Sequence, residues 1–358
     1  MSFKFRKIEK KDSIEICNLY KIAFNKPMSR INESDIFFWF YFKNVNKKHY
    51  SFLMENKNRI ISYWGFIPVS YIINNNILSG SLSFQLVSVG ETLGSTLSLW
   101  KKIKNEMQKD NISLSFTINH ENSALLLKRL GWISTPTPIL ISFLSILRLA
   151  NDMLINKIKS KIFAYFCKII FLSIDSLFLK IKCFFEKQTE NVSYTKKFGS
   201  SFQEILTEIN KNIKFGVSLN SDYLNWRYCY KPDRDYKILK YTENNIIKGY
   251  LIYKVEYNYG TKIGYIMDII VKPKNGYIVD KLIHFVKKEL RIKKVTFISI
   301  LAFKNNLFYD SIKKAYFFSV LKNLLPHRSY FSLIKHKNFD DKIKIDNWNI
   351  SWGNHDNV

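Results

Sequence analysis

Cysteine, histidine and acidic residues are scarce in this sequence, and each scarcity excludes something. The four cysteines (Cys17, Cys167, Cys183 and Cys229) are widely scattered, so we expect neither a disulfide framework nor a cysteine metal site. The six histidines are dispersed and none pairs with a cysteine, so no metal is expected. Asp and Glu number 29 against 56 Lys and Arg. The resulting net charge of +27 suggests an anionic partner, although the abundance of Lys, Asn and Ile offers a purely compositional explanation.

Targeting signals are also lacking. The chain starts MSFKFR, which does not open an apolar signal-peptide core. The apolar, basic stretch of residues 163–180 is interrupted by Lys168 and Asp175, so it is not expected to span a membrane. These absences predict a cytoplasmic protein with reduced thiols.

Apolar residues, by contrast, are plentiful, and they recur in two similar halves. Hydrophobic residues make up 47% of 358 residues and aromatic residues 16%, enough for a sizeable core and for two domains. Trp39-Phe40-Tyr41 recurs as Trp226-Arg227-Tyr228 at an offset of 187. An offset of 186 relates later pairs: Asn58 and Asn244, Gly90 and Gly276, Asn119 and Asn305, Lys128 and Lys314, and Trp132 and Phe318. Several matches in one order predict a tandem duplication.

The predicted elements also follow the same order in both halves. A helix opens each half, and then come the aromatic motif, β-branched runs with Asn- and Lys-rich turns, a strand, an amphipathic helix, a strand and a short helix. This order predicts an α/β fold of two tandem domains, each a mixed central sheet flanked by helices. We place the N-terminal domain at residues 1–138 and the C-terminal domain at residues 191–358.

Residues 139–190 belong to neither repeat and are predicted to form a helical connector. One interpretation packs this connector between the domains. The other lays it on a membrane surface, at the inner face of the membrane, with its lysines at the headgroups. The lysines concerned are Lys157, Lys159, Lys161, Lys180 and Lys182.

Several motifs resemble the GNAT (GCN5-related N-acetyltransferase) family. Residues 59–65 resemble the strands that open the GNAT core, and residues 116–123 with Leu130-Gly131-Trp132 resemble its late strand, its Asn and its last helix. Residues 222–228 and 348–356 resemble motifs of tandem GNAT proteins from surface-polysaccharide clusters. The resemblance covers most of the chain outside the connector, and it implies two tandem GNAT-like domains.

The resemblance also implies an acyl-CoA site, with acetyl-CoA or another acyl-CoA as co-substrate. In GNAT enzymes the strand before the central helix splays from its neighbour, its backbone pairs with the pantetheine arm, and the following turn holds the pyrophosphate. The matching residues here are Val87, Val89, Gly90, Gly94, Ser95 and Thr96. The usual arginine is absent and Glu91 would repel phosphate. The second half has Lys272 and Lys274 but one glycine, Gly276, and an ordinary strand-to-helix turn is the competing interpretation in both halves.

Candidate catalytic residues follow the late strand of the first half. Asn119, His120 and Glu121 stand where the central strands would part, and His120 with Glu121 is the candidate general base. An exposed loop pair is the alternative. In the second half Asp268 is a further candidate base, or a structural hydrogen-bond partner. In GNAT enzymes a tyrosine usually protonates the leaving thiolate. Leu127 stands at that position in the first half, and Lys313 stands there in the second half at the offset of 186.

Trp226 and Arg227 are candidate substrate-binding residues. A Trp at one position of both repeats is either a core anchor or a surface on which substrate stacks. Arg227 has no basic counterpart in the first half, where Phe40 stands. Its planar fork could hold a phosphate or carboxylate, or it could bridge the domains.

The sequence therefore predicts an N-acyltransferase that moves an acyl group from acyl-CoA to an amine of a nucleotide- or lipid-linked sugar. The first half is the favoured catalytic copy. An aminoacyl transferase that uses charged tRNA is a second hypothesis, because tRNA binding would suit the net charge. A non-catalytic tandem GNAT that binds at the membrane is a third, since the usual arginine and tyrosine are missing.

Overall fold

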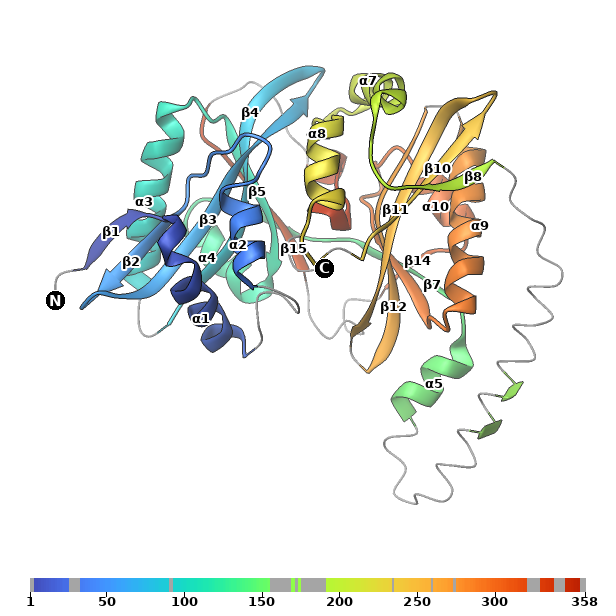
Figure 1. Ribbon diagram of the computed structural model, residues 1–358, viewed down its shortest axis with the longest axis horizontal. Helices are drawn as coiled ribbons and strands as arrows, with labels where there is room; N and C mark the ends of the chain where they lie inside the picture. The colour runs from blue at the N-terminus through green and yellow to red at the C-terminus, as the bar shows by residue number, and fades with distance from the viewer. Residues whose placement is uncertain are drawn as a thin grey trace.

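The chain forms two mixed β-sheets, each with helices packed on it (Figure 1). In this computed structural model the residues described are 3–25, 33–89, 93–154, 169–170, 173–174, 191–233, 235–258, 260–272, 275–320, 329–337 and 345–354.

The first half contains these elements: β1 (Lys4–Lys7), η1 (Lys10–Asp12), α1 (Ser13–Phe24), α2 (Glu33–Tyr41), β2 (Phe52–Asn56), β3 (Arg59–Ile73), β4 (Asn76–Ser88), α3 (Leu93–Lys109), β5 (Leu114–His120), α4 (Glu121–Arg129), β6 (Ile133–Pro136), β7 (Ile139–Phe143) and α5 (Ile146–Leu154). The second half contains these: β8 (Val192–Thr195), η3 (Ser200–Phe202), α7 (Gln203–Asn212), β9 (Phe215–Val217), α8 (Ser221–Leu224), the π-helix η4 (Asn225–Cys229), β10 (Lys237–Glu243), β11 (Ile246–Asn258), β12 (Thr261–Val271), α9 (Gly276–Ile292), β13 (Phe297–Leu301), α10 (Tyr309–Lys314), β14 (Phe318–Ser319), β15 (Ser329–Lys335), η6 (Ile345–Asn347), β16 (Trp348–Asn349) and η7 (Trp352–Asn354).

The two-residue turns of three hairpins explain how the long strands pair. Asn74 and Asn75 join β3 to β4, and Asn244 and Asn245 join β10 to β11; all four have positive φ. Lys57-Asn58 makes the same turn between β2 and β3. Two successive residues with positive φ match the right-handed twist of the flanking strands, and Asn tolerates this conformation better than other non-glycine residues.

The two sheets have the same topology, and each contains one strand from the other half. The order is β1-β2-β3-β4-β5-β15-β6 in the first sheet and β8-β10-β11-β12-β13-β7-β14 in the second. Strand β15 therefore lies between β5 and β6, while β7 lies between β13 and β14. This reciprocal exchange makes each sheet depend on residues from both halves.

Helices cover both faces of the sheets, and most of the apolar core is continuous between the halves. On the first sheet α3 packs on β2 and β3, while α1 and α2 contact β3 from the helix pair at the front. Figure 1 shows α3 and α9 at opposite ends of the molecule and α8 between the sheets. The larger apolar cluster extends from α1 and α2 through Trp39 and Trp226 into the second sheet, and a smaller one fills the space beneath α3.

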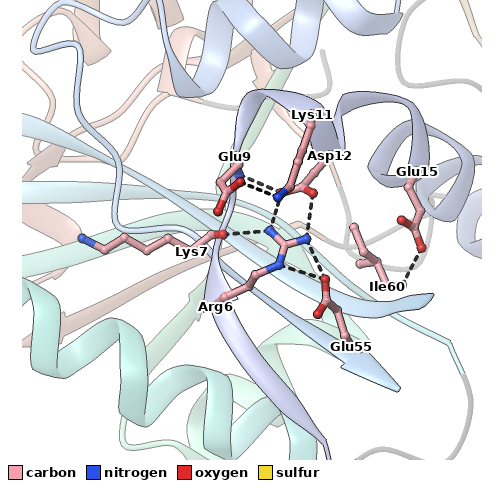
Figure 2. Close-up of polar contacts among 8 residues, drawn as sticks. All are labelled: Arg6, Lys7, Glu9, Lys11, Asp12, Glu15, Glu55 and Ile60. Carbon is pink, nitrogen blue, oxygen red and sulfur yellow. Dashed lines mark hydrogen bonds and ion pairs between the residues drawn. The ribbon is translucent and has the colours of Figure 1, made fainter. Parts of the chain in front are cut away.

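An ion-pair network fixes the N-terminal strand to the first helix (Figure 2). The Arg6 guanidinium donates to both carboxylate oxygens of Asp12, at 2.7 and 2.8 Å, and its Nε donates to Glu55 at 2.8 Å. Asp12 also accepts a hydrogen bond from the Glu9 amide at 2.7 Å. Because Asp12 is 4% exposed, this carboxylate depends on Arg6 for its charge balance.

The structure changes the offsets predicted between the halves. The offset of 187 continues through the hairpin, because Lys57-Asn58 matches Asn244-Asn245 as a turn. From β4 onward it falls to 183: Gly80 pairs with Leu114 as Ile263 pairs with Phe297. At α4 and α10 the offset is 185, so Trp132 corresponds to Phe317 rather than to Phe318. Hairpins of unequal length explain the change, and the predicted match of Gly90 with Gly276 is wrong by three residues.

The start of the predicted connector is also different. Residues 139–143 form strand β7 rather than a helix, and α5 follows it. The lysines predicted to lie at lipid headgroups are all outside the described residues: Lys157, Lys159, Lys161, Lys180 and Lys182. Within the described part of the chain, no helix is long and apolar enough to cross a membrane.

Candidate active site

Each sheet opens at the middle, between the strand before its central helix and the strand after it. In the first sheet β4 and β5 pair in parallel at three positions only, Gly80 to Leu82 against Leu114 to Phe116. Beyond these pairs β4 continues to Ser88 and β5 to His120 without pairing with each other. This opening, which we call the first gap, leaves main-chain groups of two strands without a ladder partner, as a backbone-binding ligand requires.

Backbone alternation shows which residues of β4 face the first gap. The Val89 amide donates to the Ile61 carbonyl at 3.0 Å, so Val89 faces β3. In an antiparallel ladder the direction alternates with each residue, so Val87 also faces β3, while Leu86 and Ser88 face the gap. The predicted Val87 and Val89 therefore turn their main chain toward β3, whereas the main chain of Leu86 and Ser88 faces the gap.

The N-terminus of α3 lies at the end of β4, as predicted for a pyrophosphate site. Gly94 is exposed in the first turn, and a Cβ built there would meet no atom within 4 Å. Thr96 is buried, with 5% of its surface exposed. Gly90 and the Ser95 side chain lie outside the described residues. The exposed amides and the dipole of a 17-residue helix favour an anion at this position.

The predicted catalytic residues lie at the far end of β5, beside the exchanged strand β15. The Asn119 Oδ1 accepts a hydrogen bond from the Ser332 hydroxyl at 2.8 Å. His120 is exposed and is the N-cap residue of α4. Glu121 is exposed and accepts from the Tyr330 hydroxyl at 3.3 Å. These residues are therefore near each other at the mouth of the first gap, and all three contact β15, a strand that the sequence did not place there.

The position of the usual thiolate-protonating tyrosine is apolar in both halves. Leu127 is 2% exposed on α4. Because the offset at this helix is 185, its counterpart is Ile312, which is 1% exposed, and not Lys313. A proton for a leaving thiolate would have to come from water or from the acceptor.

The second sheet opens in the same way, but its gap is filled by the C-terminal segment of the chain, Trp348–Asn354. Strands β12 and β13 pair from Ile263 to Ile266 only. Trp352 donates to the Ser299 hydroxyl at 3.2 Å, and Gly353 lies against β12. A Cβ at Gly353 would be 1.8 Å from the Tyr228 hydroxyl and 3.1 Å from the Met267 carbonyl oxygen, so only glycine fits.

The helix N-terminus beside this second gap is also occupied. Lys272, predicted as a phosphate ligand, forms ion pairs with Glu204 and, at 3.1 Å, with Glu208. The hydrogen bond that Lys272 donates to Glu204 raises the pKa of Lys272, with burial opposing it. Two carboxylates at this position disfavour a pyrophosphate, so of the two gaps the first is the better candidate for an anionic ligand.

Polar side chains occupy corresponding positions near the two gaps. In the first half the Tyr41 and Tyr63 hydroxyls each donate to Gln85 Oε1 at 3.4 Å. At the established offsets the second half has Tyr228, Tyr250 and Asp268 in these places. The same scaffold therefore carries a neutral amide in one half and a carboxyl in the other.

Asp268 is the strongly perturbed acid of the two gaps. Burial raises its pKa to about 7, while a hydrogen bond from the Ile269 amide and the positive charge of Arg227 act in the opposite direction. Asp268 lines a narrow hollow at the open end of β12 and β13. The sequence indicated Asp268 only as an acid on a strand, because the burial that changes its pKa comes from the C-terminal segment.

Trp226 and Arg227 lie at the junction of the two halves. The Trp39 and Trp226 rings stack at 4.7 Å, and each indole N–H donates to the other residue's carbonyl, at 2.9 and 3.2 Å. Arg227 is 2% exposed and donates from Nε to the Gly353 carbonyl at 2.7 Å. Both side chains pack the halves and the C-terminal segment together in this structure.

A buried cationic group around Tyr236 was not predicted from the sequence. Burial alone would raise the pKa of the Tyr236 hydroxyl, but the positive charges of Arg227, Lys231 and Lys254 lower it. Lys231 pairs with Asp233 at 2.9 Å, and Lys254 pairs with Glu256. Lys231 is close to Arg227 in sequence, but Lys254 comes from β11, so no local motif could have grouped all three. Within the described residues no group of three His, Cys, Asp or Glu side chains could hold a metal ion.

Comparison with solved structures identifies the fold. The chain is similar to a probable N-acyltransferase of Enterococcus faecalis V583, with a TM-score of 0.56, 12% identity, and 93% of this chain and 72% of that chain covered. It is similar to Saccharomyces cerevisiae N-myristoyltransferase with bound myristoyl-CoA (TM-score 0.60, 10% identity, 93% and 79% covered). It is also similar to a GCN5-related N-acetyltransferase of Anabaena variabilis (TM-score 0.59, 10% identity, 94% and 73% covered).

The chain therefore has the mixed α/β fold of GNAT-type acyltransferases, with a sheet in each half. At these identities the likeness concerns the fold alone. No protein-family model matches the sequence, and no curated protein matches it significantly.

Proposed function

We propose that this chain is an N-acyltransferase that binds acyl-CoA in the first gap and transfers the acyl group to an amine. The observation that carries the proposal is the difference between the two gaps. The first has the main chain of Leu86 and Ser88 facing an opening that leads to the N-terminus of α3. The second is filled by the C-terminal segment, and Lys272, shortly before its helix, is paired with Glu204 and Glu208. The solved neighbours include an enzyme with bound myristoyl-CoA, which supports a thioester donor.

The chemistry requires no covalent enzyme intermediate. The acceptor nitrogen attacks the thioester carbonyl, whose developing negative charge would be stabilised by main-chain amides on the gap side of β4. The N–C bond forms, the C–S bond breaks, and the nitrogen loses one proton to His120 or Glu121 at the mouth of the gap. Because Leu127 and Ile312 are apolar, the CoA thiolate takes its proton from water.

The acceptor class comes from the sequence resemblance: an amine of a nucleotide- or lipid-linked sugar in surface-polysaccharide synthesis. Amino-sugar nucleotides and lipid-linked saccharides are therefore the first acceptors to assay, with acetyl-CoA and longer acyl-CoA donors in parallel. The proposal also places the protein at the inner face of the membrane, bound to its surface. Vesicle flotation would test this binding.

Replacement of Gly94 by Asp tests the donor site. A carboxylate in the first turn of α3 stabilises the helix but repels the pyrophosphate, and the space around Gly94 accepts the side chain. We expect G94D to bind acyl-CoA about tenfold more weakly, which corresponds to about 1.4 kcal/mol. Isothermal titration with acetyl-CoA measures this.

The neutral isostere Gly94→Asn is the matched control and should bind within about twofold of wild type. Equal affinities for G94D and G94N would exclude a pyrophosphate at α3. Thermal stabilisation by tRNA instead of acyl-CoA would favour the aminoacyl transferase hypothesis. Stabilisation by neither would leave the non-catalytic binding protein as the remaining hypothesis.

A further inference from the structure

A narrow hollow remains at the open end of β12 and β13, beside the C-terminal segment that fills the second gap. Its walls are the apolar Ile266, Ile300 and Leu301, and its polar groups are Asp268, Asn306, Asn349 and Ser351. It has room for a group of about the size of one water molecule. It lies on the second sheet, apart from the proposed donor site.

The charge of the hollow comes from one group. Asp268 is its single carboxyl, and the other polar side chains that line it are neutral. Asn306 and Asn349 are hydrogen-bonded to each other, which fixes their amides on one side. Within the described residues no Lys or Arg forms an ion pair with Asp268 that would neutralise it. A partly buried carboxylate whose fellow lining groups are neutral is complementary to a small cation that donates hydrogen bonds.

The first half shows that the carboxyl is not needed to build this scaffold. There Gln85 occupies the position of Asp268 and is held by the hydroxyls of Tyr41 and Tyr63. In the second half the corresponding Tyr250 is 0% exposed, and its hydroxyl has no hydrogen-bond partner in the described structure. A buried hydroxyl without a partner beside a carboxyl is the signature of a polar group that completes the site.

We propose that this hollow is a subsite for a primary amine group, bound as ammonium by the Asp268 carboxylate with the Asn306 and Asn349 amides beside it. The hollow accepts the ammonium head of a primary amine, which is about the size of a water molecule, and excludes quaternary ammonium by size. It is an amine site in addition to the acyl-acceptor position at the first gap.

The groups that face Asp268 determine the pH dependence of this site. From η4 the Arg227 charge lowers its pKa, from β12 the Ile269 amide does the same, and burial raises it more strongly. The neutral phenols of Tyr223, Tyr228 and Tyr250 surround it and their own pKa values are raised. The ammonium should therefore bind above pH 7, where Asp268 is ionised, and should be released below it.

Thermal stability in methylammonium chloride tests the proposal on the full-length protein without any acyl donor. At pH 8 we expect a saturable rise of about 2–4 °C in the melting temperature relative to the same concentration of sodium chloride. Tetramethylammonium chloride should give no rise. At pH 5.5 the methylammonium effect should shrink several-fold in the wild-type protein, a comparison that needs no variant.

Two variants complete the test. Asp268→Asn should abolish the methylammonium effect, whereas Asp310→Asn, which removes the same charge from an exposed position on α10, should retain it. The proposal would be overturned if sodium chloride raised the wild-type melting temperature as much as methylammonium chloride at pH 8. An undiminished methylammonium effect in D268N, or none in the wild type at pH 8, would overturn it as well. Since acyl-CoA is absent throughout, these outcomes do not depend on whether the first gap binds a donor.

Discussion

At the scale of single residues, the environment of a side chain decides its role more than its type does. Gln85 and Asp268 occupy matching places beneath the two gaps, yet one is a neutral hydrogen-bond acceptor and the other an acid with a pKa raised to about 7. The cause is burial by the C-terminal segment, since Gly353 packs against Tyr228 and the neighbouring Met267. A carboxyl with such a pKa must affect the stability of the fold.

The stability of the protein should fall as pH rises from about 4 to 7 because of Asp268. Its pKa is higher in the folded protein than in the unfolded chain, so the folded state binds the proton more tightly in this range. Asp268→Asn removes this dependence. The free energy of unfolding of the variant minus that of the wild type should increase by about 1–3 kcal/mol from pH 5 to pH 8. Urea denaturation at each pH measures the difference, and parallel curves for both proteins would contradict it.

Part of the candidate site could be proposed from the sequence, and the remainder depended on distant contacts. Asn119, His120 and Glu121 were candidates because they follow a predicted strand, and their catalytic role stays a prediction. The gap-facing side of β4 could not be assigned, because the alternation between Val87 and Ser88 is set by pairing with β3. Tyr236 was missed because its burial, and the approach of Lys254 from β11, are set by the fold rather than by local sequence.

At the scale of elements, the C-terminal segment holds the two halves together. Trp348 packs against Phe116 and Phe331 of the first sheet, while Trp352 packs against Tyr265 of the second. Strand β16 adds to β9, which in turn pairs with the far end of β3. The segment thus fills the second gap and at the same time connects both sheets.

Gly353→Ala should displace this segment. The new methyl group would lie 1.8 Å from the Tyr228 hydroxyl, so segment or ring must move. We expect a loss of about 1–3 kcal/mol in the free energy of unfolding. Gly94→Ala, whose methyl group meets no atom within 4 Å, is the control and should be neutral or slightly stabilising. Tyr228→Phe in the G353A background should restore part of the loss, and no restoration would mean that another contact causes it.

Most helices, the hairpins and the order of elements along each half were predictable at this scale, whereas strand exchange was not. Asn-rich turns identified the hairpins because few other residues accept two successive positive φ values. The apolar run at residues 139–143 was assigned to a helix, since a short apolar run has no periodicity that distinguishes a strand from a helix. Its partner, β13, lies more than 150 residues away in the chain.

At the scale of the whole molecule, the exchange makes two sheets into one folding unit. Leu140 of β7 is 0% exposed in the second sheet, and Phe331 of β15 is 0% exposed in the first. The stacked Trp39 and Trp226 add a buried contact between the halves. Because each half donates a core strand to the other, neither can complete its sheet alone.

Separately produced fragments should therefore fold only together. Fragment 1–154 lacks β15, which leaves an open edge on β5, and fragment 191–358 lacks β7, which leaves one on β13. Each alone should be aggregated or partly unfolded, because an unpaired central edge exposes main-chain groups and apolar side chains. Co-expressed, they should form a 1:1 complex with a single cooperative melting transition, seen by size-exclusion chromatography with light scattering and by calorimetry.

Trp39→Ala in the first fragment should weaken this complex without preventing β-strand exchange, because it removes the indole stack and the hydrogen bond from the Trp39 indole to the Trp226 carbonyl. The expected cost is about 3–5 kcal/mol, the range for deleting a buried Trp. If instead each fragment melts cooperatively as a monomer and the two do not bind, each half completes its own sheet and the exchange of β7 and β15 is not what holds the molecule together.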